Sequence, residues 1–272
     1  VIQMKIKLGN NTWMTELTLA KRARMTYPML IGRSSLKKNH IIHSHKSYMT
    51  GVNSKGVKTR SILFNSKHVN LVSLFTPEHG LDGDELAGKW VSSRVDSLTG
   101  LKAYSLYGKT RKPDLTMLNG IDVLVFDIQD VGVRCYTYIS TMALCMEAAA
   151  DKGIEFIVLD RPNPVTGNYI EGPPIANKWQ SFVGQLPIPF RHGLTVGEIA
   201  QMAVGENWLE SNPKLKVIKM NGWNRDMSWD DTGLNWVQTS PNIPRAKSCY
   251  YYLLSLSLIH ISEPTRPLYI SY

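Results

Sequence analysis

The stretch IDVLVFDIQDVGVRCYTYISTMALCMEAAADKGIEFIVLD, residues 121–160, decides the fold of this 272-residue chain. Its two ends, residues 121–128 and 154–160, are short and almost continuously apolar, which is typical of strands covered on both faces. Between them, residues 138–153 carry apolar side chains at helical spacing and finish on a glycine. Strand, helix and strand in this order predict a parallel α/β sheet.

The same pattern continues on both sides of this stretch. Residues 69–75 and 215–220 are further short apolar runs, which predict two more strands. Residues 195–208 predict a second helix, because Thr195 is a suitable N-cap residue and Glu198, three residues later, completes a capping box. The alternation of strands and helices therefore extends over most of the chain.

Charge is distributed unevenly along the sequence. The formal net charge is +9, but residues 1–60 hold 12 Lys or Arg and a single acid, so the rest of the chain carries a net charge of −2. A folded nucleic-acid-binding module would combine such basicity with a recognisable motif or an aromatic platform, and neither occurs here. No nucleic-acid partner is expected. Residues 1–49 also show no strand and helix alternation.

Several other classes of site find little support. The three cysteines form no CxxC pair and no even disulfide framework, and no run approaches the roughly 18 apolar residues of a membrane span. His40, His43 and His45 are spaced like metal ligands but lack an accompanying acid or cysteine, so no metal site is expected. Residues 103–110, AYSLYGKT, miss a phosphate-binding loop by one residue, Ala103, and favour a strand that runs into a turn.

Acidic side chains follow three of the predicted strands at their carboxyl ends, where α/β sheets bind ligands. Glu78 follows the first strand, Asp127 and Asp130 follow the second, and Asp160 follows the third. Each acid could simply cap the next turn or helix. The stiff loop sequences PEHG and DRPNP favour a shared site for at least some of them.

Hydrolysis of a sugar acetal fits this group of acids. A carboxylic acid must protonate the leaving group, which near neutral pH requires burial that raises its pKa. We expect this of Glu78, beside an apolar strand, while an aspartate stabilises the developing positive charge or activates water. Nearby bases would bind an anionic substrate or pair with the acids themselves: Arg134, Arg161 and Arg191.

Seven motifs occur in order: LFTPEHGLDG, YSLYGKTRKP, DVLVFDIQDVGVRCYTYISTM, VLDRPNPVTG, EGP, FVGQLPIPFRHGLTVGE and TSPNIP. Through them, residues 50–244 resemble the exo-lytic β-N-acetylmuramidase family of peptidoglycan hydrolases, long catalogued as a domain of unknown function. The resemblance implies a Rossmann-like catalytic domain, residues 50–245, a smaller C-terminal domain and an active site between them. It also implies release of N-acetylmuramic acid from non-reducing ends of peptidoglycan fragments, outside the cytoplasm of a bacterium, with no nucleotide or obligatory metal cofactor.

The resemblance places the proposed catalytic glutamate, a general acid/base, at Glu78. We add His79, Asp127 and Asp130 as catalytic candidates because they occupy the same motifs. The substrate-binding candidates lie in these motifs too: Gln129, Arg134, Tyr136, Tyr138, Asp160, Arg161, Arg191 and His192. Which arginine would bind the lactyl carboxylate of muramic acid stays open, as does the choice between a retaining and an inverting mechanism.

The sequence departs from the family at both ends. The basic segment 1–49 stands where an opening strand and helix are expected, and residues 246–272 stand where the second domain should begin. Both segments look non-native, in which case half of the cleft would be missing and the chain inactive. Two other functions stay open: a non-catalytic protein that binds cell-wall sugars and, from the near match at 103–110, a nucleotide-binding α/β protein.

Overall fold

The structure is a computed structural model that describes residues 2–8, 11–17 and 57–262. By internal contacts the chain divides into two units, Val1–His43 and Ser44–Tyr272, and each is considered by itself. The histidines at 40, 43 and 45, and the metal question they raise, lie outside the described residues.

The first unit contains an antiparallel hairpin of β1 (Ile2–Leu8) and β2 (Asn11–Leu17). Its register pairs Ile2 with Leu17 and Leu8 with Asn11. For residues 1–49 we expected no alternation of strands and helices, and the described residues of this unit, two strands and no helix, do not contradict that expectation. Apolar and polar residues alternate along β1, as they do in strands.

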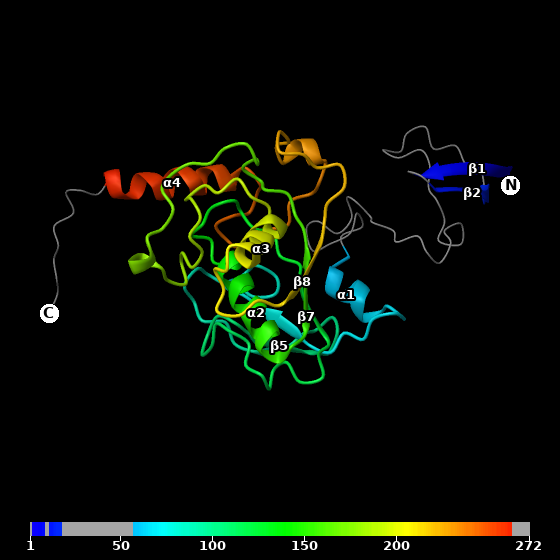
Figure 1. Cartoon of the computed structure of the whole chain (residues 1–272), viewed down its shortest axis with the longest axis horizontal. Helices are drawn as coiled ribbons and strands as arrows, with labels where there is room; N and C mark the ends of the chain where they lie inside the picture. The colour runs from blue at the N-terminus through cyan, green and yellow to red at the C-terminus, as the bar shows by residue number, and fades with distance from the viewer. Residues whose placement is uncertain (1, 9–10, 18–56, 263–272) are drawn as a thin grey trace. The chain divides into compact units, whose positions relative to one another are not determined.

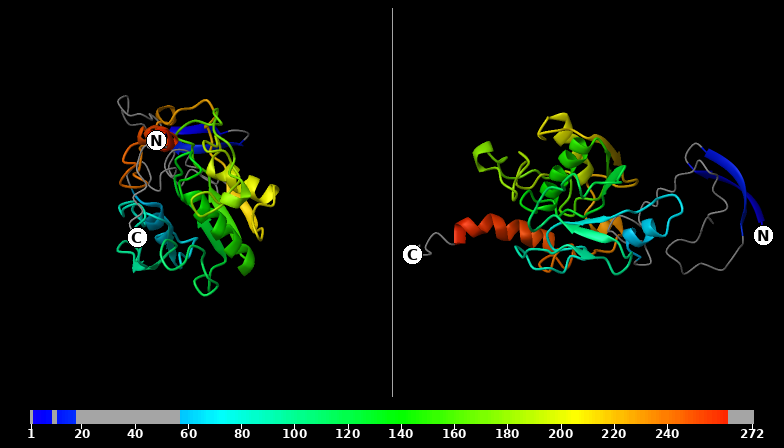
Figure 2. Two further views of the ribbon diagram at one scale, coloured as in Figure 1. Left: turned by 90° about the vertical axis from the view of Figure 1, so that its left-hand side faces the viewer. Right: turned by 90° about the horizontal axis from the view of Figure 1, so that it is seen from below.

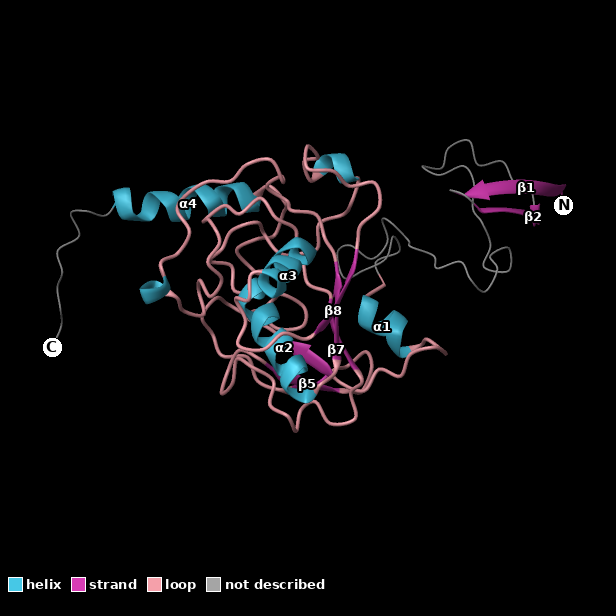
Figure 3. Cartoon of the chain, in the orientation of Figure 1, coloured by secondary structure: helices cyan, strands magenta, loops and turns pink. Residues whose placement is uncertain are grey.

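The second unit contains a parallel sheet built from the predicted strand–helix–strand stretch. Its strands are β6 (Val123–Phe126), β7 (Glu155–Leu159) and β8 (Lys214–Ile218), in the order β6–β7–β8. α2 (Tyr138–Lys152) connects β6 to β7, and α3 (Val196–Gly205) precedes β8. Figures 1 and 3 show α2 and α3 together on one side of this sheet. The predicted α/β class is confirmed.

A second, mixed sheet holds the strand that leads into the PEHG motif. β3 (Leu74–Thr76) pairs in parallel with β5 (Lys102–Ser105), and β4 (Arg94–Val95) pairs with the other edge of β5 in antiparallel orientation. One continuous parallel sheet was expected, and β3 is also shorter than the predicted 69–75. Leu74, Phe75 and Thr76 pair with β5, and among the described strands the preceding residues have no partner.

Both long helices have the ends that their sequences predict. Thr195 accepts a hydrogen bond from the backbone of Glu198, and the Glu198 side chain accepts one from the backbone of Thr195, which completes the capping box of α3. Gly153 ends α2 with a φ of 74°, a conformation that glycine adopts without steric cost. Apart from the helix Ser248–Ser262 near the C-terminus, the remaining helical segments of the described chain are shorter: α1 (Thr59–Phe64) and the 3₁₀ turns Asn177–Trp179 and Asp230–Thr232.

Two apolar clusters hold the second unit together. The larger lies where α2 and α3 cover the β6–β7–β8 sheet, with Met142, Phe156 and Ile199 fully buried. The smaller gathers residues of the VGVRCYTY segment, including Val131 and Val133, with Val165 and Ile243 from later in the chain.

The tail that was expected to be non-native forms α4 (Ser248–Ser262). Cys249 and Leu253, in its first half, are buried in the smaller cluster, and Figure 2 shows its C-terminal end, in red, extending beyond its neighbours. Tyr251 and Leu254 of the same helix are 70% and 56% exposed, and the non-native origin of this stretch stays a prediction.

Candidate active site

Glu78 lies in the loop that follows β3, and it is 93% shielded from solvent. One carboxylate oxygen, Oε1, accepts a hydrogen bond from the backbone N–H of Gly88 at 2.8 Å. The other, Oε2, accepts one from the hydroxyl of Thr137 at 2.6 Å. Since Thr137 is the residue immediately before α2, the loop and the helix together fix the orientation of the carboxylate.

The protonation state of Glu78 differs from the expectation. Burial acts to raise the pKa of Glu78, but hydrogen bonds from Thr137, Gly88 and Tyr107 and the adjacent His79 outweigh it and hold the pKa below its usual value. The expectation that burial would raise this pKa is therefore wrong. In the structure described here, Glu78 is a carboxylate at neutral pH.

His79 is buried beside Glu78 in a left-handed backbone conformation, with a φ of 71°. Its ring Nδ1 donates to the backbone oxygen of Glu85 at 2.8 Å, so the loop closes on itself. The imidazole lies 6.1 Å from the ring of Tyr136 and 6.2 Å from the ring of Tyr138, between centroids. His79 is therefore held by the loop on one side and by aromatic rings on the other.

The two tyrosines connect this group to the TSPNIP motif. The Tyr136 hydroxyl donates to Thr239 Oγ1 at 2.9 Å, and the Tyr138 hydroxyl donates to the Thr239 backbone oxygen at 2.5 Å. Burial raises the pKa of Tyr136 to about 12, so its phenol keeps its proton. Three motifs that are far apart in the sequence thus meet around Glu78.

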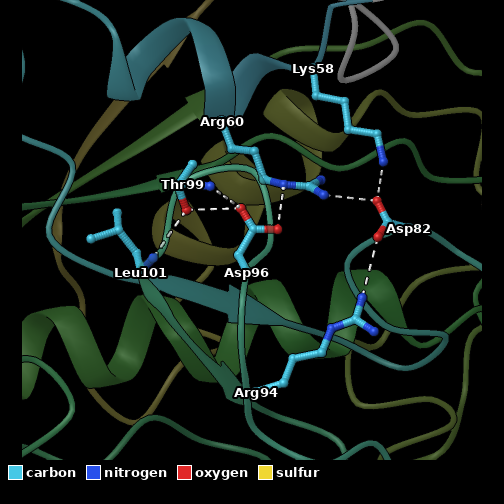
Figure 4. Close-up of polar contacts among 7 residues, drawn as sticks. All are labelled: Lys58, Arg60, Asp82, Arg94, Asp96, Thr99 and Leu101. Carbon is cyan, nitrogen blue, oxygen red and sulfur yellow. Dashed lines mark hydrogen bonds and ion pairs between the residues drawn. The ribbon is translucent and has the colours of Figure 1, made fainter.

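The loop that carries Glu78 is fastened at its other end through Asp82 (Figure 4). One oxygen of Asp82 pairs with Lys58 and with Arg60, the latter at 2.9 Å, and the second oxygen pairs with Arg94 at 3.2 Å. The Arg60 guanidinium also pairs with Asp96, which is buried, at 3.2 Å. The loop is therefore tied by charge to the start of α1 and to β4.

A second group of predicted residues gathers at the carboxyl ends of β6 and β7. Arg161, only 1% exposed, forms an ion pair with Asp127. The Gln129 amide nitrogen donates to the backbone oxygens of Asp130 and Pro162, at 2.7 and 2.8 Å. Asp127, Gln129, Arg161 and Tyr138 all line a cavity of about 740 Å³, which the side chains of Glu78 and His79 do not line.

Tyr138 belongs to both groups, because it lines the cavity and its ring packs edge-on against His79. The structure thus brings seven predicted residues into one neighbourhood: Glu78, His79, Asp127, Gln129, Tyr136, Tyr138 and Arg161.

Asp130 and His192 form a buried pair below this rim. Oδ2 of Asp130 accepts from the backbone N–H of Gly132 at 2.7 Å and lies 3.3 Å from His192 Nε2. His192 Nδ1 accepts a hydrogen bond from the backbone of Leu194, so the proton of the neutral ring is on Nε2 and faces Asp130. The pair joins the turn after β6 to the segment before α3.

The other three predicted binding residues make structural contacts. Asp160 accepts hydrogen bonds from the Gly197 backbone at 2.8 Å and from the Thr195 hydroxyl at 3.1 Å, at the beginning of α3. Arg134 donates to backbone oxygens of Pro173 and Ile188.

Arg191 completes this set. It pairs with Glu171 at 2.9 Å and donates to the backbone oxygen of Val165. The substrate-binding roles of Asp160, Arg134 and Arg191 stay predictions, and each of these side chains already makes polar contacts within the protein.

Sequence reasoning missed three residues of the Glu78 environment: Thr137, Tyr107 and Arg111. Tyr107 is hydrogen-bonded to Glu78, and burial together with this bond raises the pKa of Tyr107. The guanidinium of Arg111 lies 3.9 Å from the centre of the Tyr107 ring and 4.2 Å from that of Phe182. The signal for the last two was their place in the motif YSLYGKTRKP.

Most of the chain matches a known protein family. The family model for the N-terminal part of the exo-β-N-acetylmuramidase NamZ matches residues 47–247. The chain belongs to this family. A peptidoglycan β-N-acetylmuramidase NamZ from Bacillus subtilis (strain 168) is 50% identical over 202 residues, which make up 74% of this chain and 48% of that protein.

Solved structures agree with the fold of this NamZ-family chain. A DUF1343 family protein from Bacteroides fragilis matches 76% of the chain with a TM-score of 0.69 and 50% identity, over 52% of its own length. A second such protein from the same organism gives a TM-score of 0.62 and 36% identity, over 53% of its length. The chain therefore spans about half the length of the relatives that it matches.

The ends of the chain lie outside this family match, as the motifs predicted. A second family model, the retropepsin-like aspartic endopeptidase RimB, matches residues 1–51. These residues contain no aspartate, the residue on which aspartic peptidases depend, so we assign them no peptidase role.

Two further properties concern the described part of the chain: the length of its helices and the grouping of its metal-binding side chains. Among its residues, none of the helices combines the length and the apolar character needed to cross a membrane. The same residues contain no group of three or more His, Cys, Asp or Glu side chains that could hold a metal ion.

Proposed function

We propose that the whole protein is a glycosidase that releases N-acetylmuramic acid from the non-reducing ends of peptidoglycan fragments, outside the cytoplasm. Membership of the NamZ family and the 50% identity to a peptidoglycan β-N-acetylmuramidase support this proposal. The observation that carries it is the fixed, buried carboxylate of Glu78, held by donors from two different elements beside His79 and two tyrosines.

In this proposal, the carboxylate of Glu78 accepts and donates the proton that is transferred during hydrolysis. Because its pKa is lowered, it starts as an anion and can first accept a proton or stabilise the positive charge of an oxocarbenium-like transition state. It can act as an acid only after gaining a proton, and loss of one donor when the sugar binds would raise its pKa and allow this. Thr137 and Tyr107 are the side-chain donors whose loss would have this effect.

Arg111 is our choice for the group that binds the lactyl carboxylate of the substrate. Its guanidinium is stacked on Tyr107, the residue hydrogen-bonded to Glu78. Among the described residues, Arg111 forms no ion pair with a carboxylate, whereas Arg161 and Arg191 do. A planar guanidinium fixed between two rings is prepared for a carboxylate with little loss of side-chain freedom.

The test uses the whole protein with a chromogenic N-acetylmuramic acid glycoside. We expect Glu78→Gln to lower kcat by about 10²-fold or more, while the far-UV spectrum stays that of the parent protein. Glu85→Gln is the matched control, because Glu85 lies in the same loop and its side chain pairs with Lys89 on the surface. Turnover by Glu78→Gln at the parental rate would remove Glu78 from the mechanism.

A non-catalytic protein that binds wall sugars is the second candidate, and one observation favours it. Both oxygens of Glu78 already accept hydrogen bonds from the protein, an arrangement that also suits a purely structural carboxylate. Binding of an N-acetylmuramic acid glycoside by the whole protein, without release of its aglycone, would support this second function and contradict the first.

A further inference from the structure

The carboxylate of Glu78 lies just beneath the protein surface at Gly88. The backbone N–H of Gly88 donates to Glu78 Oε1 at 2.8 Å, and Gly88 is itself exposed. The loop reaches this position because it folds back on itself: the backbone N–H of Glu85 donates to the backbone oxygen of His79 at 3.2 Å. The segment around Gly88 therefore borders any ligand that contacts this carboxylate.

Two large apolar side chains on either side of Gly88 are exposed. Trp90 is 67% exposed and Leu86 is 63% exposed. They lie at the two ends of one turn, in which the backbone N–H of Lys89 donates to the backbone oxygen of Leu86 at 3.2 Å. Consecutive Cα atoms are about 3.8 Å apart, so the Cα of Trp90 lies within about 7.6 Å of that of Gly88. Single exposed apolar residues are common on protein surfaces, but these two lie beside the candidate catalytic carboxylate.

The backbone is fixed on both sides of Trp90. Gly88 is bonded to Glu78, and the backbone N–H of Val91 donates to the backbone oxygen of Tyr107 at 2.8 Å. Tyr107 is in turn hydrogen-bonded to Glu78. The indole ring is therefore exposed on a segment that is already ordered, which reduces the conformational entropy lost when a ligand binds to it.

An exposed indole in this position is suited to a neutral sugar ring. The C–H groups of a pyranose form apolar faces, while its hydroxyl groups lie around the rim. An indole can cover one such face and leave the hydroxyl groups in water, because aromatic side chains offer a large, flat apolar area. A charged sugar would instead require a counter-ion such as Arg111. Arg111 contacts the ring of Tyr107, whereas the Trp90 segment contacts its backbone, so the two reach Tyr107 at different points.

We propose that Trp90 is the stacking platform for the N-acetylglucosamine ring that follows N-acetylmuramic acid in the glycan, with Leu86 extending the apolar surface. This inference rests on the proposed function, since it takes Glu78 to lie at the bond between these two sugars. Arg111 then recognises the sugar that is released, and Trp90 recognises the sugar that acts as the leaving group. The protein is expected to bind a fragment with a second sugar ring more tightly than a glycoside with a small aglycone.

The test compares two ligands that share N-acetylmuramic acid. One is its disaccharide with N-acetylglucosamine, in which sulfur replaces the glycosidic oxygen so that the bond is not hydrolysed. The other is the methyl thioglycoside, which has no second ring. Calorimetry with the whole protein gives the Kd of each ligand. We expect Trp90→Ala to raise the Kd of the disaccharide about tenfold and to leave that of the methyl thioglycoside unchanged.

Three matched variants separate stacking from other effects. Trp90→Phe keeps a flat ring and should retain most of the affinity for the disaccharide, whereas Trp90→Leu keeps an apolar side chain without a flat ring and should lose as much as Trp90→Ala. Lys89→Ala is the control for disturbance of the loop, because Lys89 precedes Trp90 and pairs with Glu85 on the surface. It should change neither Kd.

The outcomes distinguish this inference from the proposed function. An unchanged Kd for the disaccharide in Trp90→Ala would overturn the inference, and a lower free energy of unfolding in that case would show that the ring packs against the protein itself. Equal losses of affinity for both ligands would also overturn it. Release of N-acetylmuramic acid from the ordinary, oxygen-linked disaccharide by the parent protein tests the proposed function separately, because the two Kd values do not depend on turnover.

Discussion

The hydroxyl of Thr137 donates a 2.6 Å hydrogen bond to the carboxylate of Glu78, which lies 59 residues earlier in the chain. This contact joins the loop after β3 to the first residue before α2, and thereby joins two sheets that share no strand. It also accounts for the protonation state of Glu78, since the hydroxyl is the strongest of the donors that lower its pKa.

Removing the hydroxyl tests the contact directly. Thr137→Val keeps the shape of the side chain, so we expect the pKa of Glu78 to rise towards its usual range and the free energy of unfolding to fall by about 1.5–3 kcal/mol, the range for a hydrogen bond to a charged group. Carbon-detected NMR titration and urea unfolding measure the two effects. Thr116→Val is the control, because Thr116 bonds Asp114 in the same way on an exposed surface. If both variants lowered the free energy of unfolding equally, burial would not strengthen the hydrogen bond between Thr137 and Glu78.

The lowered pKa of Glu78 predicts how stability depends on pH. Because the pKa is lower in the folded than in the unfolded chain, ionised Glu78 contributes stability that is fully present above its unfolded pKa of about 4.3. This contribution is lost as the pH falls through the lower, folded pKa. The difference in unfolding free energy between the parent chain and Glu78→Gln should therefore stay constant from about pH 7 to pH 5 and shrink below about pH 4.3. A difference that grew on acidification would contradict the direction of the shift.

Gly132 is a point at which the backbone tolerates no side chain. Its φ is +82°, and a Cβ there would lie 2.4 Å from both Asn163 Oδ1 and Val165 Cγ2. Gly132→Ala should lower the free energy of unfolding by about 3 kcal/mol or more. Gly100→Ala has the same kind of positive φ, +70°, but open space around it, and should cost about 1 kcal/mol. Urea unfolding of the two variants distinguishes steric crowding of the new Cβ from backbone strain. Equal losses of unfolding free energy would show that crowding at residue 132 has no effect.

The choice of Arg111 for the lactyl carboxylate predicts a change of specificity. In the whole protein, Arg111→Met should raise KM for an N-acetylmuramic acid glycoside by about 10- to 100-fold, the equivalent of a lost charge-assisted hydrogen bond. The corresponding N-acetylglucosamine glycoside lacks the carboxylate, so its kinetics should not change. Lys109→Met removes the same charge from an exposed position two residues away. If KM rises equally for both glycosides, Arg111 holds the side chain of Tyr107 in place and does not bind the carboxylate.

Local patterns in the sequence predicted most of the elements of this fold. The capping box at Thr195 and Glu198 and the glycine at the end of α2 lie where the sequence predicts them, since both depend only on neighbouring residues. The strand before the PEHG motif was predicted too long because pairing decides how far a strand extends. Residues before Leu74 have the composition of a strand but no partner in the described sheets.

The site was less predictable than the fold, for a physical reason. The sequence indicated the loops that carry Glu78, Asp127 and Asp160, but a pKa depends on groups brought together from distant positions. Thr137 and Gly88 reversed the expected direction for Glu78, and neither stands out in the sequence. Asp160 was expected at the shared rim, yet most of its contacts are with the first turn of α3.

The loop that carries Glu78 and the helix α2, which follows Thr137, are held in place by different forces. On the loop side, Asp82 gathers Lys58, Arg60 and Arg94 near the surface, whereas Thr137 leads into a helix packed by apolar side chains. Dissolved ions screen the first kind of attachment and leave the second almost untouched. Raising the ionic strength should therefore weaken the attachment of the loop that carries Glu78, while the position of α2 on the other side of the site stays the same.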